Sequence, residues 1–333
     1  MTFFVTGAGG YIGSVATYLF LSNGVRVIAV DDFSTGFRAP LNLLRERFDS
    51  QVTWYERDVR VGCDDIFQMH PDIDVVVHFA ARCSVDESVA DPLLYFNRNV
   101  AGTLALLRSM KTAGIRRIVF SSTCAVYGDA QYVPVDEHHP CVPCNPYGES
   151  KRMVEKILER CAARGELQYM VLRYFNVCGA SDDGLIGDSK KPSLLLVQNA
   201  VRGALGIESF YLTCQAVDTP DGTPIRDYVN VVDLCDAHLK AAELLIGGYH
   251  DALLNLGTGA GFSVLEILSA VEQITGKTLQ RKDTTPRKGE YAKMIASHTA
   301  ATRLLGWKPQ RSIRESVESL VRWYTSHPHG WEN

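Results

Sequence analysis

A glycine-rich turn between a short apolar run and a helical stretch is the feature that most constrains the fold of this chain. The apolar residues 3–5 come first, Gly7, Gly10 and Gly13 follow at intervals of three, and residues 25–30 form a second apolar run. Glycines that open a helix between two strands permit a tight turn, whose backbone N–H groups and helix N-terminus can bind a pyrophosphate. We therefore expect residues 3–30 to form a strand–helix–strand unit that binds a dinucleotide.

Two acidic residues, Asp31 and Asp32, close the second apolar run. A carboxylate about 20 residues after such a glycine turn can accept a hydrogen bond from the 2′-hydroxyl of the adenosine ribose. The same charge repels a 2′-phosphate. The sequence therefore predicts NAD as the cofactor in preference to NADP.

Apolar runs and helical stretches continue to alternate along the first half of the chain. Strands are predicted at residues 52–55, 74–79, 116–120 and 169–172, and helices at residues 92–113 and 147–164. Short apolar strands that alternate with helices are typical of a parallel sheet covered on both faces. The fold class that we expect is α/β, a doubly wound parallel Rossmann sheet with a smaller C-terminal α/β substrate-binding domain.

The second half has fewer long periodic segments, and residues 180–225 are interrupted by prolines and glycines. Helices are predicted at residues 232–246, 264–274 and 312–324, and a strand at residues 253–256 that returns to the first sheet. We assign residues 1–175 and 226–259 to the NAD-binding Rossmann domain. Residues 176–225 and 260–333 are assigned to the substrate-binding domain.

A tyrosine and a lysine one helical turn apart form the candidate catalytic pair. Tyr147 and Lys151 follow Pro146, a residue type that favours the first turn of a helix, and their spacing puts both side chains on one helix face. Free tyrosine has a pKa of about 10, and a nearby ammonium favours the phenolate and lowers that value. Such a pair is more often an exposed helical pair, but here the glycine turn and Ser-Ser-Thr at residues 121–123 precede it in order.

Composition excludes several classes of partner. The formal net charge is −4, so no strong field attracts nucleic acid or an acidic membrane surface. No apolar run approaches the roughly 18 residues of a membrane span, and the N-terminal residues do not resemble a secretory signal. The nine cysteines are scattered without a framework, which is typical of reduced thiols. We expect a cytoplasmic protein.

One segment imitates a metal site. Cys141 and Cys144 are separated by two residues and follow His138 and His139, a spacing compatible with zinc ligands. The segment lies in a proline-rich stretch at residues 134–146 that we interpret as a structural connection. No metal is expected.

Further motifs extend along essentially the whole chain. They are Asp58-Val59, His78-Phe-Ala-Ala81, Asn99, Ser121-Ser-Thr-Cys-Ala-Val-Tyr-Gly128, Asn145-Pro-Tyr-Gly148, Leu172-Arg-Tyr-Phe-Asn176, Thr219-Pro-Asp-Gly-Thr-Pro-Ile-Arg-Asp-Tyr228, Val231-Val-Asp-Leu234 and Asn255-Leu-Gly257. With the glycine turn, Asp31 and Lys151, they resemble the extended short-chain dehydrogenase/reductase family, and within it the UDP-glucose 4-epimerases. The resemblance implies NAD-dependent epimerisation of a UDP-hexose at C4 through a transient 4-keto sugar, and a homodimer formed by helices near residues 92–113 and 147–164.

The resemblance also implies residue roles. Tyr147 would be the base, Lys151 its activator and a ribose ligand, and Thr123 the hydroxyl that holds the sugar O4. Asn176, Arg226 and Arg287 would contact the diphosphate of the substrate, Glu290 the uridine ribose, and Met294 would limit room at the sugar 2-position or simply fill core. Cofactor contacts are implied for Gly7, Gly10, Tyr11, Ile12, Gly13, Asp31, Asp32, Asp58, Val59, Phe79, Ala80, Ala81, Asn99, Ser121, Tyr147, Lys151 and Tyr174.

Several positions depart from the family pattern. Cys83 stands where many epimerases have lysine, Thr123 replaces serine, and Glu290 replaces aspartate. A UDP-N-acetylhexosamine or UDP-uronate 4-epimerase therefore stays open as an alternative. Dehydratases of the family carry an acid just after the Thr123 hydroxyl, where this chain has Cys124 and Ala125. A non-catalytic NAD-sensing regulator typically lacks the tyrosine–lysine pair, which is intact here.

Overall fold

A seven-stranded parallel sheet forms the centre of the computed structural model, which describes residues 1–191, 193–283 and 291–331. The strand order is β10-β6-β5-β4-β1-β2-β3. These strands are β1 (Thr2–Thr6), β2 (Arg26–Asp31), β3 (Val52–Glu56), β4 (Val75–His78), β5 (Arg117–Thr123), β6 (Gln168–Tyr174) and β10 (Asp251–Leu256). The direction of chain progression reverses between β1 and β4, which creates a crevice at their carboxyl ends. The doubly wound α/β class is confirmed, as is the return of the last strand to the sheet beside β6.

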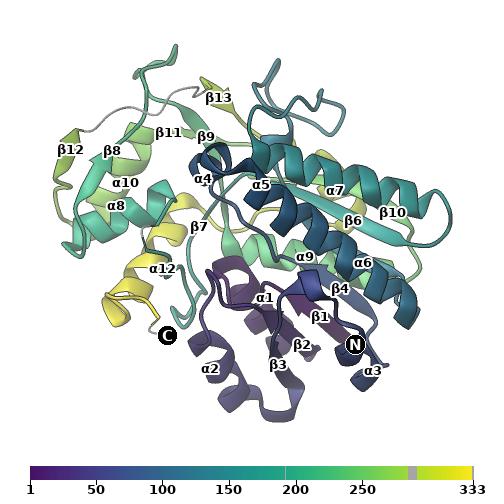
Figure 1. Ribbon diagram of the computed structural model, residues 1–333. Coiled ribbons are helices and arrows are strands. Elements are labelled where there is room, and N and C mark those ends of the chain that lie inside the picture. The colour runs from purple at the N-terminus through teal and green to yellow at the C-terminus, as the bar shows by residue number, and fades with distance from the viewer. Residues whose placement is uncertain (192, 284–290, 332–333) are drawn as a thin grey trace.

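Helices cover both faces of this sheet (Figure 1). One face carries α1 (Tyr11–Ser22), α2 (Ala39–Phe48), α9 (Val231–Ile246) and α11 (Thr299–Leu305), and the other carries α3 (Asp64–Met69), α6 (Gly102–Ala113) and α7 (Pro146–Ala162). Three short 3₁₀ turns, η1 (Asp49–Gln51), η2 (Val59–Val61) and η4 (Cys124–Val126), connect these elements. Layers of this kind explain why the strands are apolar on both faces.

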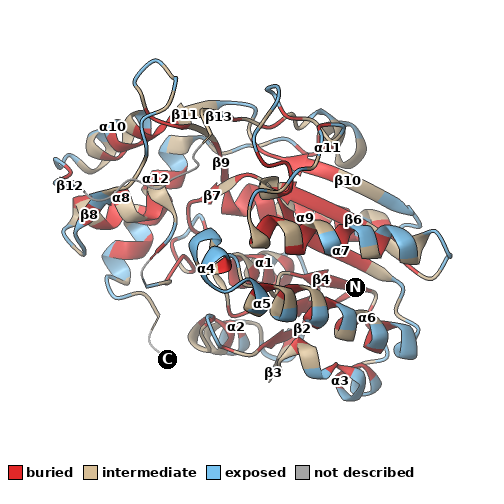
Figure 2. Ribbon diagram, turned by 45° about the horizontal axis from the view of Figure 1, so that its top comes forward, coloured by how far each residue is buried: buried red, intermediate tan, exposed pale blue. Residues whose placement is uncertain are grey.

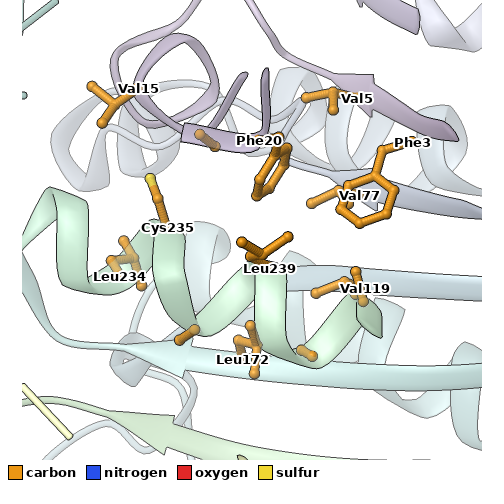
Figure 3. Close-up of a cluster of buried hydrophobic side chains, with 14 of the residues drawn as sticks. Phe3, Val5, Val15, Phe20, Val77, Val119, Leu172, Leu234, Cys235 and Leu239 are labelled. Atoms are coloured by element: carbon orange, nitrogen blue, oxygen red, sulfur yellow. The ribbon is translucent and has the colours of Figure 1, made fainter. Parts of the chain in front are cut away.

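The core divides along the two faces because successive side chains of a strand point in opposite directions. Phe3 and Val5 pack with Phe20 of α1 and Leu239 of α9 on one face, as Figure 3 shows, whereas Phe4 packs into the cluster on the other face. Each such aromatic or aliphatic side chain contributes about 1.5–3 kcal/mol when it is fully buried. Apolar packing on both faces thus supports the strands whose carboxyl ends form the crevice.

The predicted helix at residues 92–113 is a continuous helical segment with a π-helical turn inside it. It consists of α5 (Pro92–Tyr95), the π-turn η3 (Phe96–Ala101) and α6, and the short helix α4 (Val85–Ala90) precedes it. The π-turn contains Asn99, whose side chain is buried. Such turns often occur at functional sites because they re-aim one side chain out of the regular helical pattern.

A second region packs beside the sheet (Figure 1). Its four-stranded sheet contains β7 (Asn176–Cys178), β9 (Ile225–Asn230), β11 (Gly261–Ser263) and β13 (Lys293–Met294), and its two-stranded sheet contains β8 (Phe210–Leu212) and β12 (Arg281–Asp283). The helices α8 (Leu196–Leu205), α10 (Val264–Thr275) and α12 (Ile313–Ser326) enclose a separate apolar core. β9 belongs to this second sheet, although most of its residues were assigned to the Rossmann domain. α11 packs on β10 and α9, although its residues were assigned to the substrate-binding domain. The division of the chain into two domains stays a prediction.

Within the described part of the chain, none of the helices has the length and apolar character that a membrane crossing requires.

Candidate active site

The carboxyl ends of the central strands open onto a cleft with a volume of about 450 Å³. The glycine turn after β1, the acidic end of β2 and the small residues after β4 form its first half. Thr123, Tyr147 and Lys151 form the opposite wall, and the segment at residues 187–190 approaches from the second region. The cleft therefore lies at the topological switch point, where parallel sheets of this class bind their ligands.

The glycine turn is shaped by close backbone contacts. Gly7 has a φ of 70°, and a Cβ atom there would lie 2.6 Å from the backbone nitrogen of Ala80. A Cβ atom at Gly13 would lie 2.0 Å from the carbonyl oxygen of Gly7. α1 begins directly after Gly10 without a side-chain cap or an acidic residue in its first turn. Its first N–H groups are thus available to an anion, and this arrangement fits the diphosphate of NAD.

Asp31 holds the turn and faces the cleft. Its Oδ2 accepts a hydrogen bond from the backbone N–H of Gly9 at 2.9 Å, and its Oδ1 accepts one from Phe33 at 2.7 Å. Burial raises the pKa of the Asp31 carboxyl to about 6, against which the backbone hydrogen bonds act. The group is therefore ionised at neutral pH, as the discrimination against a 2′-phosphate requires.

Asp32 and Asp58 are brought together by Arg98, which the sequence analysis missed. Nη1 of Arg98 lies 2.7 Å from Oδ2 of Asp32 and 3.1 Å from Oδ2 of Asp58. A side-chain hydrogen bond from Arg60 lowers the pKa of Asp58. Because Arg98 comes from η3, the long helical segment fixes the ends of β2 and β3 at the border of the cleft.

Asn99 and Ser121 lie behind the residues that line the cleft. The Asn99 side chain accepts from the backbone N–H of Arg82 at 2.8 Å and donates to its carbonyl oxygen at 3.0 Å. The Ser121 hydroxyl is 2.8 Å from Nε2 of His238. Asn99 thus holds the segment after β4 in place, while Phe79, Ala80 and Ala81 of that neighbourhood line the cleft. The other expected cofactor residues that line it are Gly7, Gly10, Tyr11, Ile12, Gly13, Asp31, Asp32, Asp58, Val59, Tyr147, Lys151 and Tyr174.

Tyr147 meets Thr123 because α7 approaches the end of β5 closely. Asn145 caps the helix through its side chain, which accepts from the N–H of Gly148 at 2.9 Å. A Cβ atom at Gly148 would lie 2.5 Å from the carbonyl oxygen of Ala125, so only glycine permits this approach. Thr123 is held in turn by the N–H of Ala125, which donates to its Oγ1 at 3.2 Å.

Burial is the largest influence on the pKa values of both Tyr147 and Lys151. Burial raises the pKa of Tyr147 well above its usual value, and a hydrogen bond with Thr123 opposes the rise. Nζ of Lys151 donates to the carbonyl oxygen of Ser121 at 2.8 Å. Burial lowers the pKa of Lys151 itself to about 8. Burial therefore dominates the pKa of Tyr147 in this arrangement, and the lowering by Lys151 together with a bound cationic cofactor stays a prediction.

A buried ion pair fixes α7 one turn beyond Lys151. Glu155 accepts from Nε and Nη2 of Arg173 at 2.9 and 2.6 Å, and from the Ser122 hydroxyl at 2.6 Å. Both charged side chains are almost completely inaccessible to solvent. The network joins α7 to β5 and β6 directly beside Thr123.

The residues expected at the substrate end are only partly gathered. Asn176 lines the cleft, whereas Arg226 donates to the carbonyl oxygen of Tyr291 at 2.8 Å and is not a lining residue. Met294 is 5% exposed and packs with Phe175, which does line the cleft. Arg287 and Glu290 lie outside the described residues.

Cys124 and Ala125 also line the cleft, immediately after Thr123. Burial raises the pKa of the Cys124 thiol to about 12. Neither side chain can act as an acid there near neutral pH.

The histidine–cysteine segment has a structural role in the described chain. Nε2 of His139 accepts a hydrogen bond from the backbone N–H of Gln131 at 2.9 Å, and the imidazole is buried. Over residues 1–191, 193–283 and 291–331, no group of three or more histidine, cysteine or acidic side chains is arranged to hold a metal ion.

Comparison with known proteins agrees with this geometry. Residues 3–257 match the model of the NAD dependent epimerase/dehydratase family. The UDP-glucose 4-epimerase of Halalkalibacterium halodurans is 40% identical over 335 residues, which cover 99% of this chain and 98% of that protein. That of Bacillus subtilis is 36% identical and covers 100% of this chain and 99% of the relative.

Solved structures are similar over the same length. UDP-glucose 4-epimerase from Bifidobacterium longum in complex with NAD⁺ and UDP is 34% identical, with a TM-score of 0.94 over 99% of this chain and 100% of that chain. The enzyme from Stenotrophomonas maltophila with bound NAD and formylated UDP-arabinopyranose is also 34% identical, with a TM-score of 0.93 over 98% of each chain.

Proposed function

The chain belongs to the NAD dependent epimerase/dehydratase family, and from this premise we propose that it interconverts UDP-glucose and UDP-galactose by inverting C4 through a transient 4-keto sugar. The observation that carries the proposal is that Thr123, Tyr147 and Lys151 line the same cleft as the glycine turn. An acid–base group is thus available beside a dinucleotide site.

NAD is the cofactor of this reaction. When bound, it supplies the hydride acceptor and donor that inversion without net redox change requires. The open N-terminus of α1 and the close contacts at Gly7 and Gly13 suit its diphosphate, and Asp31 suits its adenosine ribose.

Proton transfer falls to Tyr147 in this proposal. As phenolate it takes the proton of the sugar 4-hydroxyl, and it returns the proton when the alcohol is formed again. The Thr123 hydroxyl, which shares a hydrogen bond with Tyr147, orients the sugar O4. Lys151 holds a positive charge on the same helix face, which favours the phenolate once the cleft is filled.

Elimination chemistry is disfavoured by the residues that follow Thr123. A dehydratase needs an acid near the leaving hydroxyl, and Cys124 and Ala125 occupy those lining positions. Neither residue can supply the acid that elimination from the 4-keto sugar would need. Return of the proton from Tyr147, with return of hydride from the cofactor to the opposite face of C4, would then complete an epimerisation.

Substrate contacts belong to the second region. We assign the diphosphate of the UDP-sugar to Asn176, Arg226 and Arg287, the uridine ribose to Glu290, and the space at the sugar 2-position to Met294. Arginine suits a diphosphate because its planar guanidinium donates two parallel hydrogen bonds.

Turnover without added cofactor tests the proposal. Purified protein should convert UDP-glucose into UDP-galactose, followed by proton NMR, and should release NAD(H) with little NADP(H) on denaturation. Folded, NAD-loaded protein that leaves UDP-glucose unchanged would contradict the function, and a predominance of NADP(H) would contradict the role of Asp31.

A homodimer in the cytoplasm completes the proposal. Figure 2 shows exposed residues along the outward faces of α4 to α7. The exposed apolar side chains of these helices include Leu93 at 78% exposure, Val89, Leu104 and Met153. Apolar patches of this kind mark association surfaces. The scattered cysteines support a reducing compartment.

Light scattering after size exclusion tests the dimer. Leu104→Glu should shift the protein from dimer to monomer, because a charge would be buried in the interface. Tyr211→Glu is the matched control, since Tyr211 is 52% exposed but lies in β8 of the second region, which packs on β12 and α8. A wild-type protein that elutes as a monomer contradicts the dimer.

A further inference from the structure

A lysine and a cysteine meet across the cleft. Nζ of Lys190 donates to Sγ of Cys83 at 3.3 Å, and both residues line the cleft. Cys83 follows β4 of the central sheet, whereas Lys190 belongs to the segment between β7 and α8 of the second region. The contact therefore spans the two sides of the cleft.

The backbone that carries Lys190 is fixed by the C-terminal aromatic residues. Nε1 of Trp323 donates to the carbonyl oxygen of Asp188 at 3.0 Å, and the backbone N–H of Trp331 donates to the Ser189 hydroxyl at 3.0 Å. A Cβ atom at Gly187 would lie 2.5 Å from the Trp323 ring, so the segment is packed tightly against it. Lys190 is thus presented to the cleft from a firm support.

Within the described residues the ammonium of Lys190 has no ion-pair partner; burial disfavours its charge, but Cys83 and Asp188 outweigh this effect and raise its pKa. Three arginines that line the cleft form ion pairs with carboxylates: Arg57 with Asp65, Arg82 with Glu87, and Arg98 with Asp32 and Asp58.

Asp188, the nearest acidic neighbour in sequence, is occupied by other donors. It accepts from the backbone N–H of Lys190 at 3.2 Å and from the Ser193 hydroxyl at 2.9 Å. A thiol is only a weak acceptor. The ammonium therefore loses little when it exchanges Cys83 for an anion.

The position of the pair selects the anion. Cys83 is close enough to Tyr147, Lys151 and Tyr174 to influence their protonation, and Asp188 influences that of Tyr11 at the start of α1. Lys190, which contacts Cys83, thus lines the same cleft as the glycine turn and the catalytic tyrosine. A nucleotide diphosphate passes through this part of such a cleft.

We propose that Lys190 is a diphosphate-binding residue of this site, which transfers its ammonium from the Cys83 thiol to a phosphate oxygen when a nucleotide binds. Lysine binds phosphate as a mobile point charge, which suits a side chain that exchanges partners. The inference rests on the proposed function to the extent that NAD and a UDP-sugar are the two diphosphates in question.

Two binding measurements on four variants test this role. We would compare Lys190→Gln, Lys190→Arg, Cys83→Ala and the control Lys191→Gln, since Lys191 is the exposed neighbour and does not line the cleft. The first measurement is the NAD(H) released per protein on denaturation. The second is the Kd of UDP for NAD-saturated protein, by calorimetry.

Lys190→Gln should weaken one of the two ligands by about tenfold or more, the loss expected for one charge-assisted hydrogen bond. Lys190→Arg should keep most of the affinity, and Cys83→Ala and Lys191→Gln should stay within about twofold of wild type. Loss of NAD(H) alone assigns Lys190 to the diphosphate of the cofactor, and a weaker Kd for UDP assigns it to that of the substrate.

The proposal is overturned if Lys190→Gln matches Lys191→Gln in both measurements. It is also overturned if Cys83→Ala loses as much affinity as Lys190→Gln, because the thiol–ammonium contact itself would then shape the cleft. Neither measurement needs turnover, so a protein that fails to epimerise UDP-glucose still shows whether Lys190 binds a diphosphate.

Discussion

Nδ1 of His78 lies 2.6 Å from Oγ1 of Thr6, inside the sheet below the cleft. The Thr103 hydroxyl donates its one proton to the carbonyl oxygen of Asn99 at 2.6 Å. In its contact of 2.9 Å with Nε2 of His78 it is therefore the acceptor, and Nε2 carries the proton. Nδ1 is then the acceptor for the Thr6 hydroxyl, which itself accepts from the N–H of Ala80 at 3.2 Å. The chain of hydrogen bonds requires a neutral imidazole and orients the backbone that meets Gly7.

This arrangement predicts how the cost of a His78→Gln substitution depends on pH. Burial lowers the pKa of His78 to about 3, whereas an unfolded histidine titrates near about 6.5. Between these values the unfolded state binds more protons, so the contribution of His78 is complete above pH about 6.5 and is lost as the pH falls toward 3. The destabilisation caused by His78→Gln should therefore be largest at pH 7 and shrink at pH 5.

Urea unfolding of the wild type and of His78→Gln at pH 7 and at pH 5 measures the difference in their free energies of unfolding. The contributions of other titrating groups cancel in this difference. His329→Gln, at an exposed position, is the control and should cost less than about 0.5 kcal/mol at both pH values. An equal cost of His78→Gln at pH 7 and pH 5 would show that the imidazole is not held neutral.

Tyr147→Phe should retain NAD but lose epimerisation by several orders of magnitude, because it removes the only atom proposed to exchange the proton of the 4-hydroxyl. The measurements are released NAD(H) and the rate of UDP-galactose formation. Tyr132→Phe is the control, since its exposed hydroxyl donates to Asp136 outside the cleft. A Tyr147→Phe variant with more than about a tenth of the wild-type rate is incompatible with a base at this position.

The alkaline limit of activity should report Lys151. Burial lowers the pKa of this ammonium to about 8, so its charge is present below that pH and is lost as the pH rises through it. kcat should therefore decline above pH 8. Lys151→Arg, which stays charged, should have a lower rate but no such decline, and Lys156→Arg on the exposed side of α7 should keep the wild-type profile. An unchanged alkaline limb in Lys151→Arg would assign it to another group.

Glu155→Gln should destabilise the protein by about 3–5 kcal/mol, the usual cost of leaving a buried charge without its partner. Arg173 would lose two charge-assisted hydrogen bonds in a site that water does not reach. Glu159→Gln, one turn further along α7 and half exposed, is the matched control and should cost less than about 1 kcal/mol. Urea unfolding at neutral pH gives both values, and equal costs would show that the buried pair adds nothing.

The sequence predicted the elements whose signal is local. The glycine turn, the apolar strands and the long helix after Pro146 depend on residues within one or two turns of one another, so pattern and propensity suffice. β13 consists of two residues paired with β9, and its formation depends on a partner that is distant in the chain. Short strands of this kind, including β7, β8 and β11, carry no periodicity and were not predicted.

The candidate site divides in the same way. Tyr147 and Lys151 belong to a motif with fixed spacing, whereas Lys190 lies in a segment without a recognisable pattern. Arg98 lies in a helix that was predicted, but the pattern of that helix does not show which of its side chains lines the cleft. The helical spacing of Lys151 likewise does not reveal that its Nζ donates to the carbonyl oxygen of Ser121. Direction and burial of a side chain depend on tertiary packing, which one sequence does not display.

Met294 provides the test of sugar specificity. Its side chain packs behind Phe175 and Cys124, both of which line the cleft, and its backbone pairs with Arg226. A smaller residue should let this wall retreat and admit an N-acetyl group, and a ring should push it forward. Met294→Cys should therefore raise kcat/KM for UDP-N-acetylglucosamine relative to UDP-glucose, and Met294→Tyr should lower it, each by about tenfold.

Both substitutions also disturb packing, which costs about 1–3 kcal/mol for the larger side chain. Met110→Cys is the control for that effect, because Met110 is equally buried but lies in α6 on the other face of the sheet. Loss of stability alone lowers the active fraction for both sugars and leaves their ratio unchanged. A ratio within about twofold of wild type in both Met294 variants would place the residue in the core and assign the limit on sugar size to another part of the wall.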